Sequence, residues 1–306
     1  MDMKDQNTNR RSVLAKLALF AGGALVAPSI APLLGSLVVA QEDSGASADE
    51  NIFRELMNKA VQQGWDRRPI GEVVTAVGLS FLGAPYVAHS LEAPGSERLI
   101  VNLHAFDCTT FYESTLVLSR CIKLGRHEFD DFKRQLQFVR YRSGVLDGYP
   151  SRLHYFTDWV ADNSRKNVVR DVTEELGGVR LKKHLDFMST HVSAYRQLRD
   201  PGNLSKIIET EHQINAREQY YVPKNLVGGI QHKVQPGDII GIMTSLEGLD
   251  ASHTGMAIVD EGTVRFLHAP LSGGFVERSP HSLAEYLAGH AQQTGIVVAR
   301  PLEPKT

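Results

Sequence analysis

Cys108 is the residue whose type and position could do chemistry. It directly follows Asp107, and the chain from Cys108 to Leu124 has no glycine or proline before Gly125. This pattern predicts a helix that begins at the cysteine, with Asp107 as its N-cap. A helix N-terminus favours the thiolate, which is the nucleophilic form of cysteine. We therefore predict that Cys108 is a nucleophile, which requires a histidine base brought near it by the fold.

His253 and His268 are the best candidates for that base and its orienting partner. They lie in two strand-like runs, 253–259 and 263–269, that read as a β-hairpin. If Glu261-Gly262 is a two-residue loop, the two histidines share one face of the hairpin as diagonal neighbours, roughly 7–8 Å apart. A three-residue loop with plain pairing would instead put them on opposite faces.

The elements that must position these residues are mainly helices first and strands afterwards. This order predicts an α+β fold in which the cysteine helix packs on an antiparallel sheet. Besides the cysteine helix and the hairpin, helices are predicted at 50–62, 70–82 and 127–142, and strands at 98–103, 239–243 and 297–299.

Other roles for Cys108 fit the sequence less well. Along one helix, Cys108 and Cys121 are about 20 Å apart, whereas bridged cysteines have Cα atoms within about 7 Å, so we expect no disulfide. A zinc site formed with His104 and His127 lacks the closely spaced ligand pairs of such sites. A serine hydrolase is not indicated, because no Gly-x-Ser-x-Gly elbow occurs. We predict neither a metal nor a cofactor.

The first forty residues are predicted to be an export signal. Arg10-Arg11 precede an uncharged apolar run from Leu17 to Ala40, as in twin-arginine signals. The run is long enough to span a bilayer, but glycines and prolines interrupt it. We therefore favour cleavage, with no stable membrane insertion afterwards, and a periplasmic or secreted protein. Residues 41–50 are predicted to be a flexible linker, followed by a single catalytic domain at 51–306.

The composition is that of an ordinary globular protein, with 42% hydrophobic and 22% charged residues. The formal net charge of -2 provides no basic excess to neutralise a phosphate backbone. Nucleic acid is therefore not an expected partner.

The middle of the chain, about 145–222, is rich in aromatic and hydrogen-bonding side chains. This composition fits either a solvated helical subdomain or the wall of a carbohydrate or peptide cleft. We treat this region as a large, mostly helical insertion in the catalytic domain.

A resemblance to a known family rests on short motifs that occur in order along residues 70–300. Several of them resemble motifs of the NlpC-type papain-like cell-wall hydrolases: Gly83–Val87, Phe106–Phe111, Gly237–Ile240, Ser252–Ala257 and Leu267–Ala269. Three more resemble its N-acetylmuramoyl-L-alanine amidase-like branch: Arg140–Gly144, Ser151–Trp159 and Gly248–His253. The departure from the wider pattern is Thr109, where a serine is usual.

The resemblance implies a papain-like core and a cysteine amidase that acts on peptidoglycan or its muropeptide fragments. Cys108 would attack the carbonyl between N-acetylmuramic acid and L-alanine, His253 would carry the proton, and His268 would orient His253. The implied substrate-binding residues are Tyr86, Asp107, Thr109, Arg140, Tyr141, Arg152, His154, Tyr155, Trp159 and Asp250.

Two other functions are compatible with the same motifs. A stem-peptide endopeptidase would use the same three residues on a different amide bond. A noncatalytic module that binds cell-wall glycan would keep the fold but would have no need of a thiol at position 108.

Overall fold

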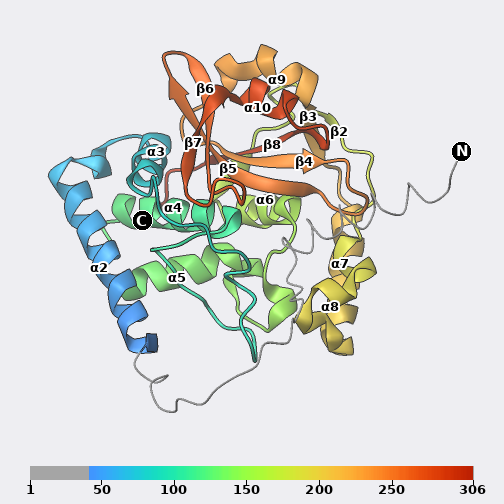
Figure 1. Ribbon diagram of the computed structural model, residues 1–306, viewed down its shortest axis with the longest axis horizontal. Coiled ribbons are helices and arrows are strands. Elements are labelled where there is room, and N and C mark those ends of the chain that lie inside the picture. Colours follow the sequence, from blue (N-terminus) through green and yellow to red (C-terminus); the bar gives the residue numbers. More distant parts are fainter. Residues whose placement is uncertain (1–40, 306) are drawn as a thin grey trace, which may run out of the picture.

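The computed structural model describes residues 41–305, whose arrangement is shown in Figure 1. Residues 1–40 and 306 lie outside the described part, and the predicted export signal falls there. Within residues 41–305, no helix is both long and apolar enough to cross a membrane.

One antiparallel sheet of eight strands forms the centre of the fold. Its strand order is β2-β3-β8-β4-β5-β6-β7, and β1 also pairs with β8. The sheet confirms the α+β prediction. The strands are β1 (Val169–Asp171), β2 (Val179–Arg180), β3 (Tyr220–Pro223), β4 (Ile239–Thr244), β5 (Ala251–Asp260), β6 (Thr263–His268), β7 (Glu277–Ser282) and β8 (Gln293–Pro301).

Helices cover both faces of this sheet, with α4 to α6 below it and α9 and α10 above it in the view of Figure 1. The longer ones are α2 (Gln41–Gln62), α3 (Ile70–Ser80), α4 (Cys108–Lys123), α5 (Phe129–Arg140), α6 (Phe156–Arg165) and α8 (Pro201–Asn215). The shorter ones are α7 (Phe187–Thr190), α9 (Lys224–Ile230) and α10 (Leu283–Ala288). Single 3-10 turns lie at Trp65–Arg67, Arg142–Gly144, Tyr149–Ser151, Val192–Ala194, Arg196–Arg199 and Gln231–Lys233.

A hydrophobic core lies on each face of the sheet, and alternate residues of the strands point into one or the other. In β4, Ile239 and Met243 join the core shared with α2 to α6, whereas Ile240 and Ile242 join the core under α9 and α10. This alternation follows from the two-residue period of a strand. A sheet buried on both faces gives the strands next to the site a rigid support.

Helix α4 begins at Cys108, as predicted. Asp107 is its N-cap, and a capping box with Thr110 fixes the first turn. Gly125 follows the helix with a φ of +63°, a conformation that glycine adopts readily. Cys108 and Cys121 are both free thiols, which confirms that the two do not pair.

The predicted strand at 98–103 is wrong. Its residues pair with no strand of the described chain, because distant side chains bind its backbone groups instead. Arg140 and Tyr141 donate hydrogen bonds to its carbonyl groups, and Asp49 accepts one from its last N–H, with distances of 2.6–3.1 Å. The segment is therefore held by side chains of other elements and forms no ladder.

Two predicted boundaries also differ from the structure. Helix α2 begins at Gln41 and so includes the predicted linker 41–50; Asp49, through its bonds to Leu103 and His104, attaches this helix to the loop before Cys108. Residues 145–222 are not one insertion, because α6 packs in the main core and β1 and β3 extend the sheet. Only the part around α7 and α8 has a small core of its own.

Candidate active site

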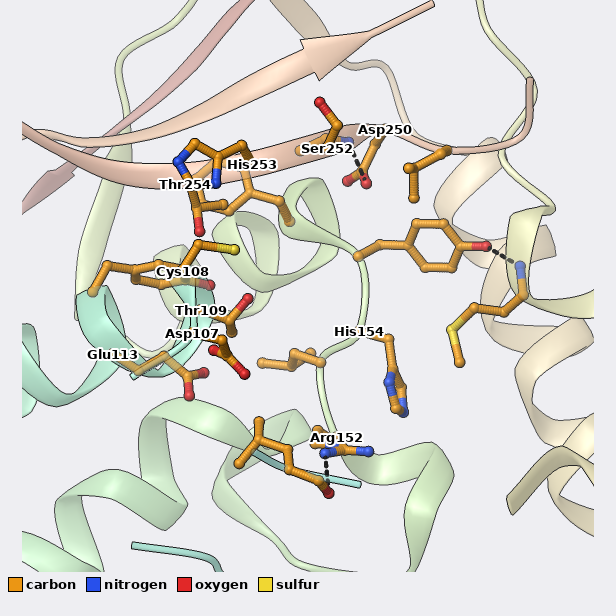
Figure 2. A pocket seen from close by; sticks show the side chains of 18 of the residues that line it. Asp107, Cys108, Thr109, Glu113, Arg152, His154, Asp250, Ser252, His253 and Thr254 are labelled. Carbon is orange, nitrogen blue, oxygen red and sulfur yellow. Dashed lines mark hydrogen bonds between the residues drawn. The ribbon is translucent and has the colours of Figure 1, made fainter. Parts of the chain in front are cut away.

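A cavity of about 210 Å³ opens at the N-terminus of α4. Its walls come mainly from five regions that lie apart in the sequence: residues 86–92, the α4 start, residues 152–156, α7, and residues 249–254 at the start of β5. Figure 2 shows Cys108, His253 and Thr254 towards one side of this cavity and Arg152 and His154 towards the other.

The N-cap holds Cys108 in place at the cavity wall. Asp107 Oδ1 accepts hydrogen bonds from the Thr110 backbone N–H (2.7 Å) and hydroxyl (2.9 Å), and Asp107 Oδ2 accepts one from Ser90 (2.6 Å). Both carboxylate oxygens are therefore engaged, and Asp107 acts on the helix start. The thiol that follows is only 8% exposed, although it lines the cavity.

The hairpin β5–β6 brings His253 and His268 together as predicted. Residue 260 pairs with 263 and Gly255 with His268, so the loop is the two-residue kind. His253 Nε2 lies 2.7 Å from His268 Nδ1, and both rings are buried. Since Nε2 of His253 is engaged, Nδ1 is the ring nitrogen left for chemistry.

Burial determines the protonation states of the Cys108 thiol and of the two imidazoles. It raises the pKa of the Cys108 thiol to about 11, and the neighbouring Asp107 carboxylate adds to the rise, while polar groups of Thr254 and Thr109 oppose it. Burial also lowers the pKa of His253 to about 4 and that of His268 to about 2. The resting pair is therefore thiol and neutral imidazole, contrary to the thiolate expected from the helix N-terminus alone.

Tyr86 lies beside the thiol. Burial raises the pKa of its phenol, and the closeness of Cys108 and Asp107 contributes to that rise. The phenol therefore keeps its proton at any ordinary pH. Tyr86 can donate a hydrogen bond into the cavity next to the sulfur.

The far wall holds polar side chains that are fixed by partners. Arg152 donates to Glu92 (2.5 Å) and to the Leu91 carbonyl (2.9 Å). His154 Nε2 lies 3.0 Å from the Tyr149 carbonyl oxygen, and burial beside Arg152 holds the pKa of His154 well below its usual value.

Tyr155 and Asp250, two more predicted binding residues, are likewise engaged within the wall. The Tyr155 hydroxyl donates to Glu211 (2.7 Å). Asp250 accepts from Thr157 N–H (2.8 Å) and from Ala251 N–H (2.6 Å), and burial raises its pKa. The two side chains shape the wall and offer the substrate few free polar atoms.

Two of the predicted binding residues do not line the cavity. Trp159 is buried in the core and donates to Glu113 (3.1 Å), and Tyr141 donates to Glu97 (2.9 Å). Arg140 does reach the lining, but its guanidinium is paired with Glu113 at 2.7 Å. Arg140, Tyr141 and Trp159 therefore take part in buried polar contacts within the protein.

Sequence reasoning missed several residues of the site. Glu92, Phe187, Met188 and Tyr195 line the far wall, and no local motif marks them. Glu277 was also missed; its carboxylate lies 3.7 Å from His268 Nε2. Its signal would have been the pairing of β7 with β6, which puts it directly opposite His268.

Among the described residues, no group of three or more histidine, cysteine, aspartate or glutamate side chains is arranged to hold a metal ion. His104 of the zinc alternative contacts Asp49 at 3.0 Å instead.

Comparison with known proteins gives a consistent picture. Residues 76–296 match the AmiA-like family, described as N-acetylmuramoyl-L-alanine amidase-like. The crystal structure of an N-acetylmuramoyl-L-alanine amidase from Bacteroides uniformis is similar, with 34% identity and a TM-score of 0.72 over 76% of this chain and 98% of that one. No curated protein matches.

Two further crystal structures share the fold. One is a putative xylanase from Bacteroides fragilis, with 37% identity and a TM-score of 0.67 over 74% of this chain and 99% of that one. The other is protein LPG0564 from Legionella pneumophila, with 19% identity and a TM-score of 0.64 over 85% and 96%. The latter likeness concerns the fold alone.

Proposed function

The chain belongs to the N-acetylmuramoyl-L-alanine amidase-like family, and we propose that it is a cysteine hydrolase of peptidoglycan or muropeptides. In this proposal it cuts the amide bond between N-acetylmuramic acid and L-alanine. The observation that carries the proposal is that Cys108 and His253 line one cavity, with His268 held 2.7 Å behind the base. Nucleophile, base and orienting group are then ordered as in a catalytic triad.

The first step is attack by the Cys108 sulfur on the lactyl carbonyl carbon. Because the resting pair is neutral, the thiol proton passes to His253 Nδ1 as the C–S bond forms. His253 then gives this proton to the nitrogen of L-alanine as the C–N bond breaks. The peptide leaves with a free amino group, and the muramyl part stays on Cys108 as a thioester.

The second step returns the thiol. His253 Nδ1 takes a proton from a water molecule that attacks the thioester carbonyl carbon. The C–S bond breaks, the sulfur recovers the proton, and the muramic acid leaves with a free carboxyl group. The same histidine therefore serves twice, first towards the peptide nitrogen and then towards water.

Negative charge on the carbonyl oxygen needs donors at the helix start. Asp107 caps the Thr110 amide, while the amides of Cys108 and Thr109 are too near the helix end to have intrahelical acceptors. These amides, with the Tyr86 hydroxyl as a helper, suit an oxyanion hole. In this arrangement Thr109 and Tyr86 contact the reacting group, whereas Arg152, His154 and Tyr155 form the wall around the rest of the substrate.

We also propose that the core is papain-like, of the NlpC type. The supporting features are α4, which carries the nucleophile at its first position, and its packing against β5, which carries the base. The antiparallel order β4-β5-β6 then carries both histidines on adjacent strands.

The test is product analysis with a defined muropeptide. We expect wild-type protein to release N-acetylmuramic acid and an intact peptide that begins with L-alanine, identified by mass spectrometry. Cys108→Ala should lower the rate by about 1,000-fold or more, because it removes the nucleophile. Cys121→Ala, the same change on the same helix but away from the cavity, is the matched control and should retain activity.

Other products would replace this proposal with one of its alternatives. Cleavage within the peptide, with Cys108 still required, would make the protein a stem-peptide endopeptidase. Binding without cleavage would make it a glycan-binding module. Full activity in Cys108→Ala would overturn the cysteine mechanism itself.

We further propose that residues 1–40 direct export, so that the enzyme meets its substrate in the periplasm or outside the cell. The support is the Arg10-Arg11 pair before an apolar run. Fractionation of cells that express wild-type protein or the Arg10→Lys, Arg11→Lys variant tests this. Equal export of both would contradict a twin-arginine signal.

A further inference from the structure

The contact between His253 and His268 leaves the position of one proton undetermined. His253 Nε2 and His268 Nδ1 are 2.7 Å apart, so one nitrogen donates and the other accepts. Both rings are neutral, since burial lowers the pKa of each. Two arrangements of the pair are therefore possible, and they differ in whether His253 Nδ1 carries a free lone pair or a proton.

Only one arrangement is competent for the proposed reaction. If His253 Nε2–H donates to His268, then His253 Nδ1 is free to take the thiol proton, and His268 carries its own proton on Nε2. If His268 Nδ1–H donates instead, His253 carries its proton on Nδ1 and cannot act as a base towards Cys108. A neutral imidazole has a single N–H, so the two rings must switch together.

The carboxylate of Glu277 lies where it distinguishes these arrangements. Its Oε1 is 3.7 Å from His268 Nε2, and strand pairing sets Glu277 directly opposite His268. In the competent arrangement the carboxylate faces an N–H. In the other arrangement it faces a nitrogen lone pair, which is repelled. The distance exceeds that of a hydrogen bond, so the effect at rest is electrostatic.

The backbone at Gly273 lies close to the Glu277 carboxylate, which is partly exposed. A Cβ at Gly273 would lie 2.8 Å from Glu277 Oε2, so the backbone of the β6–β7 connection packs closely against the carboxylate. The titratable groups near His268 are His253 on β5, Glu277 on β7, and Tyr286 and His290 at α10 and just after it. Of these, Glu277 is the acid closest to Nε2.

We infer that Glu277 is a positioning residue: it holds His268 in the Nε2–H form and thereby keeps His253 Nδ1 free as the base towards Cys108. The inference rests on the proposed function, because it explains how the base of that reaction is kept in its working form. Glu277 touches neither substrate nor sulfur in this scheme. It acts through His268 alone.

The first test is the tautomer of His253, measured by ¹⁵N NMR of histidine-labelled protein without substrate at neutral pH. His253→Asn identifies the signals. In wild type we expect protonation at Nε2 in both rings. In Glu277→Gln, whose amide can donate to His268 Nε2, we expect His253 to shift towards the Nδ1–H form. Unchanged tautomers in Glu277→Gln would overturn the inference.

The second test is the rate of cleavage of a muropeptide. We expect Glu277→Gln to lower kcat by about 10-fold or more with little change in KM, by analogy with the loss of a carboxylate that orients a metal-bound histidine. Glu277→Asp keeps the charge and should recover part of the rate. Glu261→Gln removes a charge at the exposed turn of the same hairpin and should leave the rate unchanged.

Failure of this inference is distinguishable from failure of the proposed function. Wild-type kcat in Glu277→Gln together with complete dependence on Cys108 would overturn the role of Glu277 alone. Retained activity in Cys108→Ala would overturn the reaction scheme, whatever the tautomer of His253.

Discussion

Two buried polar clusters lie beside the same cavity, each with one member on helix α4, and burial affects their charges in opposite ways. The Glu113 cluster consists of Glu113, Arg140 and Trp159; its charges are paired at 2.7 Å, and the indole N–H donates to the same carboxylate. The thiol–histidine cluster consists of Cys108, His253 and His268, and its groups are neutral because burial opposes their charged forms.

The difference shows what burial does to each kind of group. A buried charge that is paired with an opposite charge uses its hydrogen-bonding atoms within the protein, so few of them can bind a substrate. A neutral thiol and imidazole keep a proton and a lone pair that can still be exchanged. The first arrangement holds α4, α5 and α6 together, and the second can do chemistry.

The largest expected effect comes from removing the base of the thiol–histidine cluster. His253→Ala should lower kcat by about 1,000-fold, since general bases contribute in the range of 100- to 10,000-fold. The free energy of unfolding should change less in His253→Ala than in Glu113→Gln, the variant of the other cluster. Steady-state kinetics and urea unfolding of the same preparation measure both. A His253→Ala enzyme within tenfold of wild type would place the base elsewhere.

Removing the acid of the Glu113 cluster should have the opposite effect, with a large loss of stability and little loss of activity. Glu113→Gln leaves the Arg140 guanidinium buried without its counter-charge, which we expect to cost about 3 kcal/mol of stability. Activity per folded molecule should stay within about threefold. Glu50→Gln, which breaks an exposed pair with Arg54, is the control and should cost less than about 0.5 kcal/mol.

A Glu113→Gln protein with unchanged stability but a 100-fold lower kcat would contradict the purely structural role of the Glu113 cluster. The Glu113 cluster would then belong to the reaction. Urea unfolding and kinetics on the same sample decide between the two outcomes.

The smallest predicted effect is a pH dependence of stability. Below pH 6.5 an unfolded histidine binds a proton, whereas folded His253, with its pKa lowered to about 4, does not. Its contribution to stability is therefore complete above pH 6.5 and is lost as the pH falls towards 4, by about 1.4 kcal/mol per pH unit.

His253→Asn should reduce this acid loss by about 2 kcal/mol between pH 6.5 and pH 4.5. Urea unfolding of both proteins at several pH values gives the difference. Parallel stability curves for wild type and variant would mean that folded His253 binds a proton as readily as unfolded His253, and the lowered pKa would be wrong.

The parts of the site that depend on local rules were predictable from the sequence. The cap residue Asp107 and the uninterrupted run after it define the start of α4. The two-residue turn at Glu261-Gly262 defines the register that joins the histidines. Both features depend only on neighbours in the chain.

The parts that depend on distant partners were not predictable. Arg140 and Trp159 were proposed as binding residues from the family motifs, and their common partner, Glu113, lies 27 and 46 residues away, where no local pattern indicates it. Segment 98–103 looked like a strand because the side chains that occupy its backbone come from other elements. Glu277 depends on a β6–β7 pairing that contains a register shift, which no turn motif fixes.

The central claim is that Cys108 carries the acyl group of the muramyl part during the reaction. Its most direct test is to quench wild-type protein with acid during turnover of a muropeptide and to map the adduct by peptide mass spectrometry. We predict an N-acetylmuramyl group on Cys108, with no amino acid attached. An unmodified Cys108 during turnover, or an adduct on Cys108 that includes part of the stem peptide, would contradict the account.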